Sequence, residues 1–167
     1  MKYFLVGMPS CGKSSLAKII GKEINIQFID LDKEIEIVEK RSINEIFNIK
    51  GEGYFRKIES EVLNSIIKSN KSFIMATGGG TPCYNDNMKI INNNGISIFL
   101  DVKISELETR LKNKKDRPLL NRYPDKGQIL KKIYDERKSY YHESNYTISD
   151  IKDQKTEILS IIRQLKS

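Results

Sequence analysis

Cysteine and histidine are scarce in this sequence, and long apolar runs are absent. The chain of 167 residues contains two cysteines and one histidine. Cys11 and Cys83 fit no metal-ligand spacing, so we expect free thiols, and we assign no role to His142. A chain of this length can bury a sizeable core without disulfides or metals. A membrane protein is excluded, because no apolar run approaches the roughly 20 residues that cross a bilayer.

The first residues and the overall charge indicate where the protein is located and which kinds of ligand it binds. The apolar run near the start is too short for a signal peptide and predicts a cytoplasmic protein. Lysine and arginine number 29 against 22 acidic residues, a net charge of +7. Because the lysines are scattered rather than gathered in one stripe, this charge suits anionic small substrates better than nucleic acid. We therefore expect one globular domain, residues 1–167, that is monomeric and binds neither nucleic acid nor membrane.

One turn carries the strongest chemical signal. Residues Gly7 to Ser14, GMPSCGKS, match the phosphate-binding pattern G-x-x-x-x-G-K-[ST] at every fixed position. A strand-like apolar run precedes the turn and helical spacing follows it, which is the context that the motif needs. Backbone N–H groups of such a loop bind nucleotide phosphates. Lys13 would reach the β- and γ-phosphates and the Ser14 hydroxyl would bind Mg²⁺. An ordinary glycine-rich turn is the alternative.

Short apolar runs alternate with helical patterns along the whole chain. This alternation predicts an α/β fold with three layers, in which a parallel sheet lies between helices. Ligands of such sheets bind at the carboxyl ends of the strands. The expected strands are 2–6, 25–29, 72–76, 96–100 and 146–148, and the expected helices are 13–23, 33–40, 43–48, 54–69, 86–93, 105–112, 126–142 and 155–165.

Two aspartates follow the second expected strand. Asp30 and Asp32 are two residues apart, and such residues share a face of an extended chain. Both carboxylates could therefore point toward a metal ion and a hydroxyl acceptor. The alternative is that Asp32 only caps the helix expected from Lys33. A third carboxylate, Asp101 after the fourth strand, would instead bind the metal if the protein were a P-loop ATPase acting as a switch.

Glycines and arginines mark the other candidate positions. Three consecutive glycines, Gly78 to Gly80, are entropically costly, so close approach of a ligand to the backbone explains them better than a plain turn. Arginines are scarce beside lysines, and the guanidinium fork suits carboxylates and phosphates. The arginines near loops or cleft-facing segments are Arg56, Arg110, Arg117, Arg122 and Arg137.

Six segments are more specific in their order and spacing than any single motif. They are the phosphate loop, FIDLD at 28–32, SINEIF at 42–47, GEGYFRKIE at 51–59, TGGG at 77–80 and DRPLL at 116–120. Together they resemble the shikimate kinase family of the nucleoside-monophosphate-kinase-like P-loop group. The resemblance implies a five-stranded sheet in the order 2-3-1-4-5. It also implies phosphoryl transfer from MgATP to the 3-hydroxyl of shikimate, on the route to chorismate and aromatic amino acids.

The resemblance assigns roles on the acceptor side. Asp32 would hold and polarise the shikimate hydroxyl, and helices at about 33–61 would bind the substrate. Arg56, oriented by Glu59, and Arg137 would clamp the shikimate carboxylate. A gluconate or nucleotide kinase is the close alternative, and the paired arginines and FIDLD argue against it. The expected acceptor contacts are Asp32, Arg56, Gly78, Gly79, Gly80 and Arg137.

On the nucleotide side, the resemblance implies that Asp30 contacts Mg²⁺ through its water shell. Arg117 would stabilise the transferring phosphoryl group from a lid at about 112–124. Ser10-Cys11 departs from the small residues of many family members. Cys11 lies near a helix N-terminus, which favours a thiolate, so thiol reagents are expected to inactivate the enzyme. The expected nucleotide contacts are Gly7, Pro9, Ser10, Cys11, Gly12, Lys13, Ser14, Ser15, Arg110 and Arg117.

Overall fold

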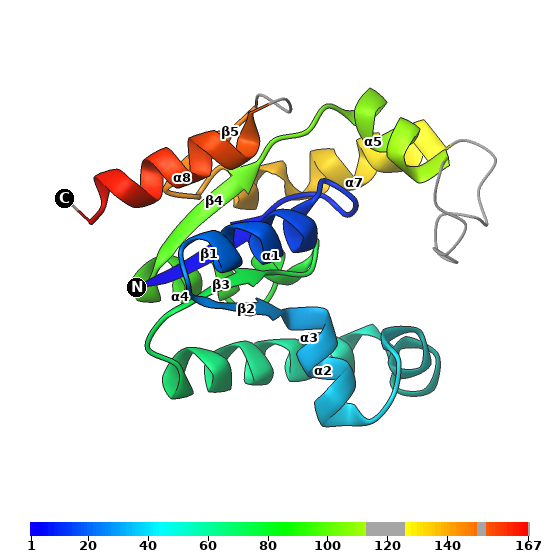
Figure 1. Cartoon of the computed structure of the whole chain (residues 1–167). Coiled ribbons are helices and arrows are strands. Elements are labelled where there is room, and N and C mark those ends of the chain that lie inside the picture. The colour runs from blue at the N-terminus through cyan, green and yellow to red at the C-terminus, as the bar shows by residue number, and fades with distance from the viewer. Residues whose placement is uncertain (113–125, 150–152, 167) are drawn as a thin grey trace.

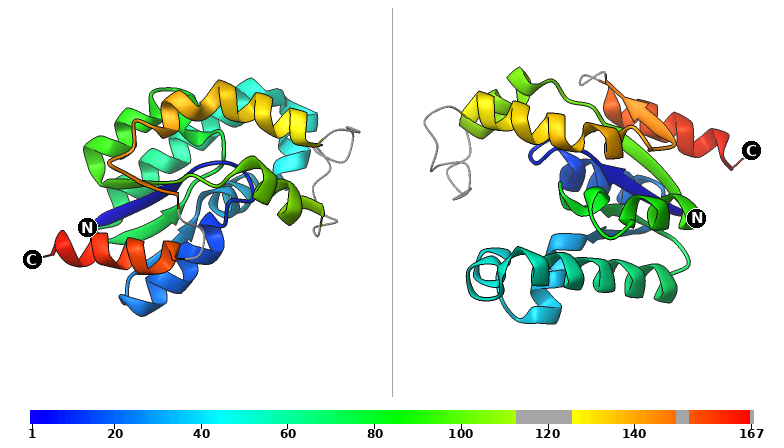
Figure 2. Two further views of the ribbon diagram at one scale, coloured as in Figure 1. Left: turned by 90° about the horizontal axis from the view of Figure 1, so that it is seen from above. Right: turned by 180° about the vertical axis from the view of Figure 1, so that it is seen from behind.

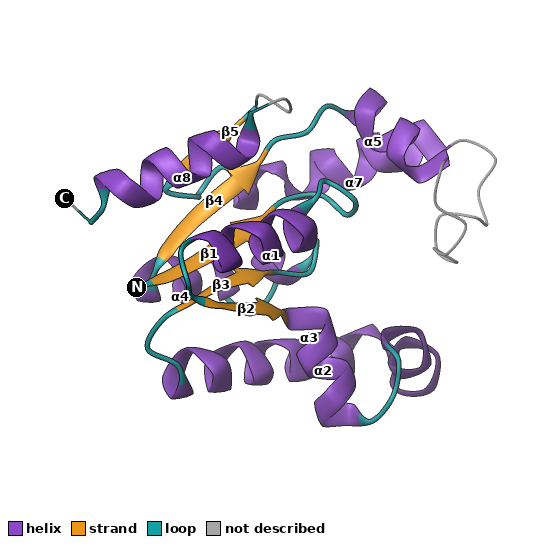
Figure 3. Ribbon diagram, viewed as in Figure 1, coloured by secondary structure: helices purple, strands orange, loops and turns teal. Residues whose placement is uncertain are grey.

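A five-stranded parallel sheet forms the centre of the computed structural model, which describes residues 1–112, 126–149 and 153–166 (Figure 3). The strands lie in the order β2-β3-β1-β4-β5, which confirms the order expected from the sequence. Their bounds are β1 Lys2–Val6, β2 Gln27–Asp30, β3 Phe73–Ala76, β4 Ile96–Leu100 and β5 Tyr146–Ile148.

Helices cover both faces of the sheet and complete three layers. Seen from above, α1 and α8 lie on one face, and α3, α4 and α7 lie on the other (Figures 1 and 2). Helix α2 packs against α3, beside the edge strand β2. The bounds are α1 Lys13–Glu23, α2 Leu31–Glu39, α3 Ile43–Ser69, η1 Thr81–Cys83, α4 Asn87–Asn94, α5 Ile104–Lys112, α7 Lys126–Tyr141 and α8 Gln154–Gln164.

The central strands are apolar because both of their faces are covered. Leu5 and Val6 of β1 are fully buried, and so are all four residues of β3. Parallel sheets with helices on both faces have this continuous apolar character. The register pairs Leu5 with Ala76 and Val6 with Phe99, so neighbouring strands end at the same level. The first residues after β1 and β3, together with Asp30 at the end of β2, therefore meet at one edge of the sheet.

Helix α3 differs most from the sequence prediction. It is one element of 27 residues that begins with a capping box formed by Ser42 and Glu45. The expected break is present at Gly51, whose φ of 79° and ψ of 172° are not helical, but the helix resumes at once instead of after Gly53. The short helix η1 was not expected. The kink at Gly51 separates an N-terminal segment, beside α2, from the long segment that carries Arg56 and Glu59.

Part of the predicted nucleotide site falls beyond the described ranges. Residues 113–124 of the expected lid, with Arg117 and Arg122, lie outside the described residues. In the described part of the chain, no helix combines the length and the apolar character that a membrane crossing needs.

Candidate active site

The phosphate loop joins the carboxyl end of β1 to the first turn of α1. The buried Lys13 amine turns back into this loop and donates hydrogen bonds to the carbonyls of Gly7 (2.9 Å) and Met8 (2.8 Å). Gly7 has a φ of 138°, and a Cβ there would lie 2.9 Å from the carbonyl oxygen of Leu100. Glycine is therefore required at this position. The loop wraps around a cation at the positive end of a helix, an arrangement that attracts phosphate.

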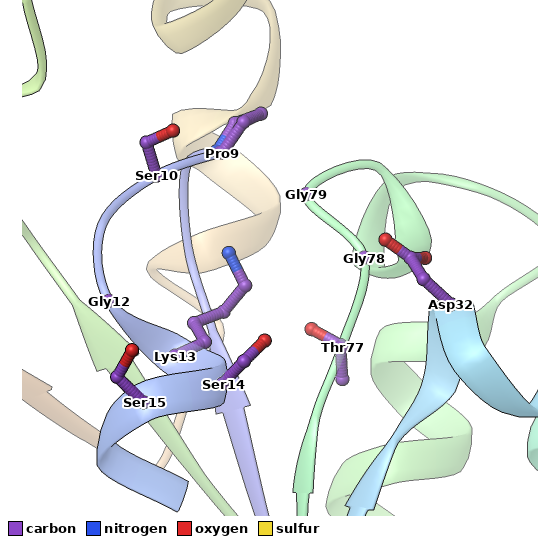
Figure 4. Close-up of a pocket in the computed structure, with 10 residues that line it drawn as sticks. All are labelled: Pro9, Ser10, Gly12, Lys13, Ser14, Ser15, Asp32, Thr77, Gly78 and Gly79. Carbon is purple, nitrogen blue, oxygen red and sulfur yellow. The ribbon is translucent and has the colours of Figure 1, made fainter. Parts of the chain in front are cut away.

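A pocket of about 210 Å³ opens beside the loop (Figure 4). The Lys13 amine enters it from the loop, and the Asp32 carboxylate lies on the opposite side. A cation suited to phosphate thus faces a carboxylate that can accept a proton from a hydroxyl group. The lining residues come from the loop, the start of α2 and the turn after β3: Pro9, Ser10, Gly12, Lys13, Ser14, Ser15, Asp32, Thr77, Gly78 and Gly79.

Cys11 belongs to the hydrophobic core instead of the pocket lining. Its side chain is fully buried, and its sulfur lies 3.6 Å from the Lys13 amine. Because the folded loop buries this sulfur, the expected inactivation by thiol reagents would require the loop to open, and it stays a prediction. The carbonyl of Cys11 accepts a 2.9 Å hydrogen bond from Arg110, whose Nε also bonds Glu106 at 3.0 Å. Arg110 thus lies directly beside the phosphate loop.

Asp30 and Asp32 occupy different elements. Asp30 ends β2, accepts a 2.7 Å hydrogen bond from the Ser14 hydroxyl, and caps α2 through the backbone N–H of Lys33 at 3.4 Å. Asp32 is the second residue of α2, which begins at Leu31. The alternative that Asp32 caps the helix is therefore wrong, and so is the extended-strand argument that put both carboxylates on one face. Asp32 lines the pocket directly, whereas Asp30 approaches it through Ser14.

Asp101, the alternative metal-binding carboxylate, has a structural partner. It follows β4 and accepts a 3.2 Å hydrogen bond from the hydroxyl of Tyr134 on α7. The hydroxyl of the phosphate loop, Ser14, bonds Asp30 instead. This arrangement disfavours the ATPase-switch alternative, which needs Asp101 at the metal.

The turn after β3 packs so closely on the site that it has no room for side chains. None of the three glycines, Gly78 to Gly80, has the positive φ that favours glycine. A Cβ on the first would lie 3.0 Å from an oxygen of Asp32 and of Glu59, one on the second 2.8 Å from Pro9, and one on the third 2.6 Å from Arg56. Close approach explains these glycines better than a plain turn, although the sequence predicts that a ligand makes that approach. The groups that approach in this structure are side chains of the protein itself.

Arg56 is held by two carboxylates. Its Nη1 donates to Glu59 at 2.8 Å, while Nε and Nη2 donate to one oxygen of Glu52 at 3.2 and 3.1 Å. Glu59 is fully buried, and its other oxygen accepts a 2.6 Å hydrogen bond from Thr81. Burial acts to lower the pKa of Arg56, but the charge and hydrogen bonds of Glu59 and Glu52 outweigh it and raise the pKa. The guanidinium is therefore fixed in place and fully charged.

Arg137 approaches the same region from α7. It lies beside the hydroxyl of Tyr141, whose pKa is raised by burial and held down in part by the Arg137 charge. Burial raises the pKa of the Cys83 thiol to about 11, and the charges of Arg137 and Arg56 oppose this rise. The Tyr141 hydroxyl donates a 2.6 Å hydrogen bond to the carbonyl of Gly79. The two predicted arginines, carried by different helices, therefore converge around η1.

Some residues of the site escape prediction from the sequence. Glu52 stands four residues before Arg56, and this spacing predicts an ion pair on a helix, so it could have been found. Tyr141 and Thr81 carry no comparable signal, because their partners are distant in the sequence. The missed residues are Glu52, Thr77, Thr81, Tyr84 and Tyr141, all of which line the pocket or contact a predicted site residue.

The fold and the site define a P-loop kinase, in which the phosphate loop and the Asp32 carboxylate line one pocket. The shikimate kinase family model matches residues 9–166. A shikimate kinase of Sulfurihydrogenibium sp. (strain YO3AOP1) is 36% identical over 159 residues, 95% of this chain and 93% of that protein. The chain therefore belongs to the shikimate kinase family and is an ATP-dependent kinase.

Two solved structures agree with this assignment. Shikimate kinase from Bacteroides thetaiotaomicron has a TM-score of 0.89 at 28% identity, covering 98% of both chains. Shikimate kinase from Acinetobacter baumannii, in complex with shikimate, also has a TM-score of 0.89, at 29% identity over 99% of this chain and 94% of that chain. The similarity therefore extends over nearly the whole chain.

Proposed function

We propose that this kinase transfers the γ-phosphoryl group of ATP to the 3-hydroxyl of shikimate and releases ADP and shikimate 3-phosphate. The observation that carries the proposal is the arrangement around Gly78 to Gly80. Asp32 and Arg56 both lie within 3.0 Å of Cβ positions on this turn, and the same turn borders the phosphate pocket. A site for a hydroxyl group and a site for a carboxylate thus adjoin a site for phosphate, as a hydroxy acid acceptor requires.

On the nucleotide side, the loop backbone and Lys13 bind the phosphates of ATP. Lys13 exchanges its two loop carbonyls for phosphate oxygens, so its N–H donors stay hydrogen-bonded while its charge gains an anionic partner. Arg110, held at the loop by Glu106, supports this end of the nucleotide site. Arg117, which lies outside the described residues in the expected lid at about 112–124, is assigned to neutralise the charge of the transferring phosphoryl group. Phosphoryl transfer needs little covalent help, so positioning and neutralisation of charge supply most of the rate.

Ser14 and Asp30 are the residues that would hold Mg²⁺. Their oxygen atoms lie 2.7 Å apart beside the phosphate loop, and hard oxygen donors suit this ion. Within the described ranges, no cluster of three or more histidine, cysteine or acidic side chains offers an all-protein metal cage. This agrees with an ion bound by one carboxylate, water and substrate phosphates. When bound, Mg²⁺ would neutralise charge on the β- and γ-phosphates.

On the acceptor side, Asp32 accepts a hydrogen bond from the shikimate hydroxyl and takes up its proton as the phosphoryl group arrives. Arg56 and Arg137 hold the shikimate carboxylate, helped by backbone groups of Gly79 and Gly80. Because Glu59 fixes Arg56 before any substrate binds, little side-chain entropy is lost when the carboxylate arrives. Helices α2 and α3 carry Asp32 and Arg56, and the helices at about 33–61 are proposed to bind the substrate within one kinase domain.

A coupled assay of ADP release tests the proposed function. Release should depend strongly on shikimate and far less on gluconate or nucleoside monophosphates. Asp32→Asn should lower turnover by about two orders of magnitude, the scale of losing a general base, while ATP still binds. Equal ADP release with and without an acceptor would refute the proposal. The cytoplasmic location and the monomeric state stay predictions, and light scattering of the purified protein tests the second.

A further inference from the structure

Arg56 presents two edges of its guanidinium group, and both are in contact with carboxylates. One edge, at Nη1, donates to Glu59 at 2.8 Å. The other edge, formed by Nε and Nη2, donates to Oε1 of Glu52 at 3.2 and 3.1 Å. Two parallel N–H groups on one edge are the part of an arginine that binds a carboxylate in bidentate fashion. Glu52 therefore occupies the edge that the carboxylate of a substrate would use.

The two glutamates differ in how firmly they are held. The Glu59 side chain is 0% exposed, whereas that of Glu52 is 54% exposed. If Glu59 moved away from Arg56, a buried charge would be left without a partner, which is strongly unfavourable. Glu52 can return to water at small cost, because exposed ion pairs contribute little. Only the Glu52 contact can therefore be exchanged for a ligand.

The neighbours of Glu52 hold its carboxylate near Arg56 but do not prevent a ligand from replacing it. The hydroxyl of Tyr84 donates a 3.2 Å hydrogen bond to the same Oε1 atom, and the Tyr84 ring lies 4.3 Å from the Arg56 guanidinium carbon. Glu52 also directly follows Gly51, whose φ of 79° breaks the helix. The side chain thus stands at the first position after the kink in α3.

We propose that Glu52 is an internal competitor for the substrate carboxylate and sets the affinity of the acceptor site. It keeps the open edge of Arg56 satisfied before substrate binds and gives that edge up to the carboxylate of shikimate. This inference rests on the proposed function, because it requires that Arg56 binds that carboxylate. Competition by Glu52 raises the KM for shikimate above the value that Arg56 alone would give.

Steady-state kinetics of Glu52→Gln test the inference. The change keeps the shape of the side chain but removes its charge, so the KM for shikimate should fall about two- to five-fold, the range of an exposed ion pair. The KM for ATP should stay unchanged, and kcat should change by less than two-fold. Tyr84→Phe, which removes one hydrogen bond to Glu52 and keeps the ring, should lower the KM in the same direction by a smaller factor.

Glu61→Gln is the matched control, because Glu61 lies on the same helix, is exposed, and pairs only loosely with Lys57 at 3.9 Å. It removes the same charge and should leave the KM for shikimate unchanged. A second control is a shikimate analogue with a hydroxymethyl group in place of the carboxylate, whose affinity should be the same in wild type and Glu52→Gln. If Glu52→Gln improves the affinity for the analogue equally, or if Glu61→Gln lowers the KM for shikimate equally, the effect comes from the net charge of the protein. Either result would overturn the inference.

The remaining outcomes separate this inference from the proposed function. If wild-type ADP release does not depend on shikimate, the proposed function fails. If ADP release by the wild type depends on shikimate but Glu52→Gln raises the KM or leaves it unchanged, the competition by Glu52 is refuted while the proposed function stands. A raised KM would instead make Glu52 a positioning residue for Arg56.

Discussion

The hydroxyl of Tyr141 donates a 2.6 Å hydrogen bond to the carbonyl of Gly79, across 62 residues of sequence. It ties α7 to the turn that packs against Asp32, Glu59 and Arg56. Tyr141 is fully buried. The position of the acceptor site therefore depends on a contact between the middle and last thirds of the kinase.

Tyr141→Phe should destabilise the protein by about 1–2 kcal/mol, the cost of leaving one buried hydrogen-bonding group unpaired. The KM for shikimate should rise because the turn is held less firmly, while the KM for ATP changes less. Urea unfolding and steady-state kinetics measure these effects. The neighbouring Tyr140 is 38% exposed, so Tyr140→Phe is the control and should behave as wild type. Equal effects of both substitutions would contradict this role of the hydroxyl.

Asp30→Asn should be far more damaging than Asp101→Asn. Asp30 bonds the phosphate-loop hydroxyl of Ser14, and loss of such a partner of a metal ligand typically costs about 10–100-fold in activity or metal affinity. The Asp101 carboxylate accepts a hydrogen bond from Tyr134, which the asparagine oxygen can also accept. Titration of activity with Mg²⁺ would measure both variants. The reverse ranking would favour the ATPase-switch alternative.

Glu59→Gln should lower the free energy of unfolding by about 3 kcal/mol, because it leaves the 11% exposed guanidinium of Arg56 without its buried partner. The KM for shikimate should rise at the same time. The exposed Glu61→Gln should stay within about 0.5 kcal/mol of wild type. The double variant Arg56→Met/Glu59→Met should recover part of the lost stability without recovering activity, since an apolar pair can replace a buried ion pair. Chemical denaturation of the four proteins tests this pattern.

Two glycines of α3 should respond in opposite directions to alanine. Gly51 has a φ of 79° and a ψ of 172°, a region that is nearly exclusive to glycine, so Gly51→Ala should cost about 1–3 kcal/mol. Gly53 is helical, and a Cβ there would meet no atom within 4 Å. Gly53→Ala should therefore stabilise the protein by about 0.5–1 kcal/mol. Thermal unfolding distinguishes the two, and destabilisation by both would mean that the helix is also broken at Gly53.

Stability should decline in alkali in part because of Cys83. Burial raises the pKa of its thiol from 9.0 to about 11, so between these values the unfolded chain has lost a proton that the folded protein retains. The contribution of this thiol to the free energy of unfolding is therefore fully present below pH 9 and is lost as the pH rises toward about 11. In Cys83→Ala the free energy of unfolding should decline less steeply in alkali. Near neutral pH, the wild type and the variant should show the same dependence of stability on pH. An identical alkaline slope in both would contradict the raised pKa.

Local patterns predicted the alternation of strands and helices and the phosphate loop, whereas the order of the strands was implied by the family resemblance. The bounds of β1, β4 and β5 agree with the apolar runs, because each strand is a short stretch buried on both faces or flanked by turn residues. The phosphate loop was also evident, since its glycines, lysine and serine act at fixed spacing within one turn. Helix α2 begins two residues earlier than predicted, because Asp30 and not Asp32 caps it. The sequence alone does not decide which of the two aspartates is the cap.

The acceptor side is decided by contacts between residues that are distant in sequence. Nothing near Cys11 indicates that its sulfur faces the core, because which side of a loop is inward depends on what packs beneath it. The reason for three glycines in a row became clear only when Pro9, Asp32, Glu59 and Arg56 were placed around them. Burial of Glu59, which fixes Arg56, and the reach of Tyr141 to Gly79 likewise require the packed helices. Periodicity in a sequence reports which face of an element is apolar, whereas the pairing of polar groups across elements is settled only by their packing.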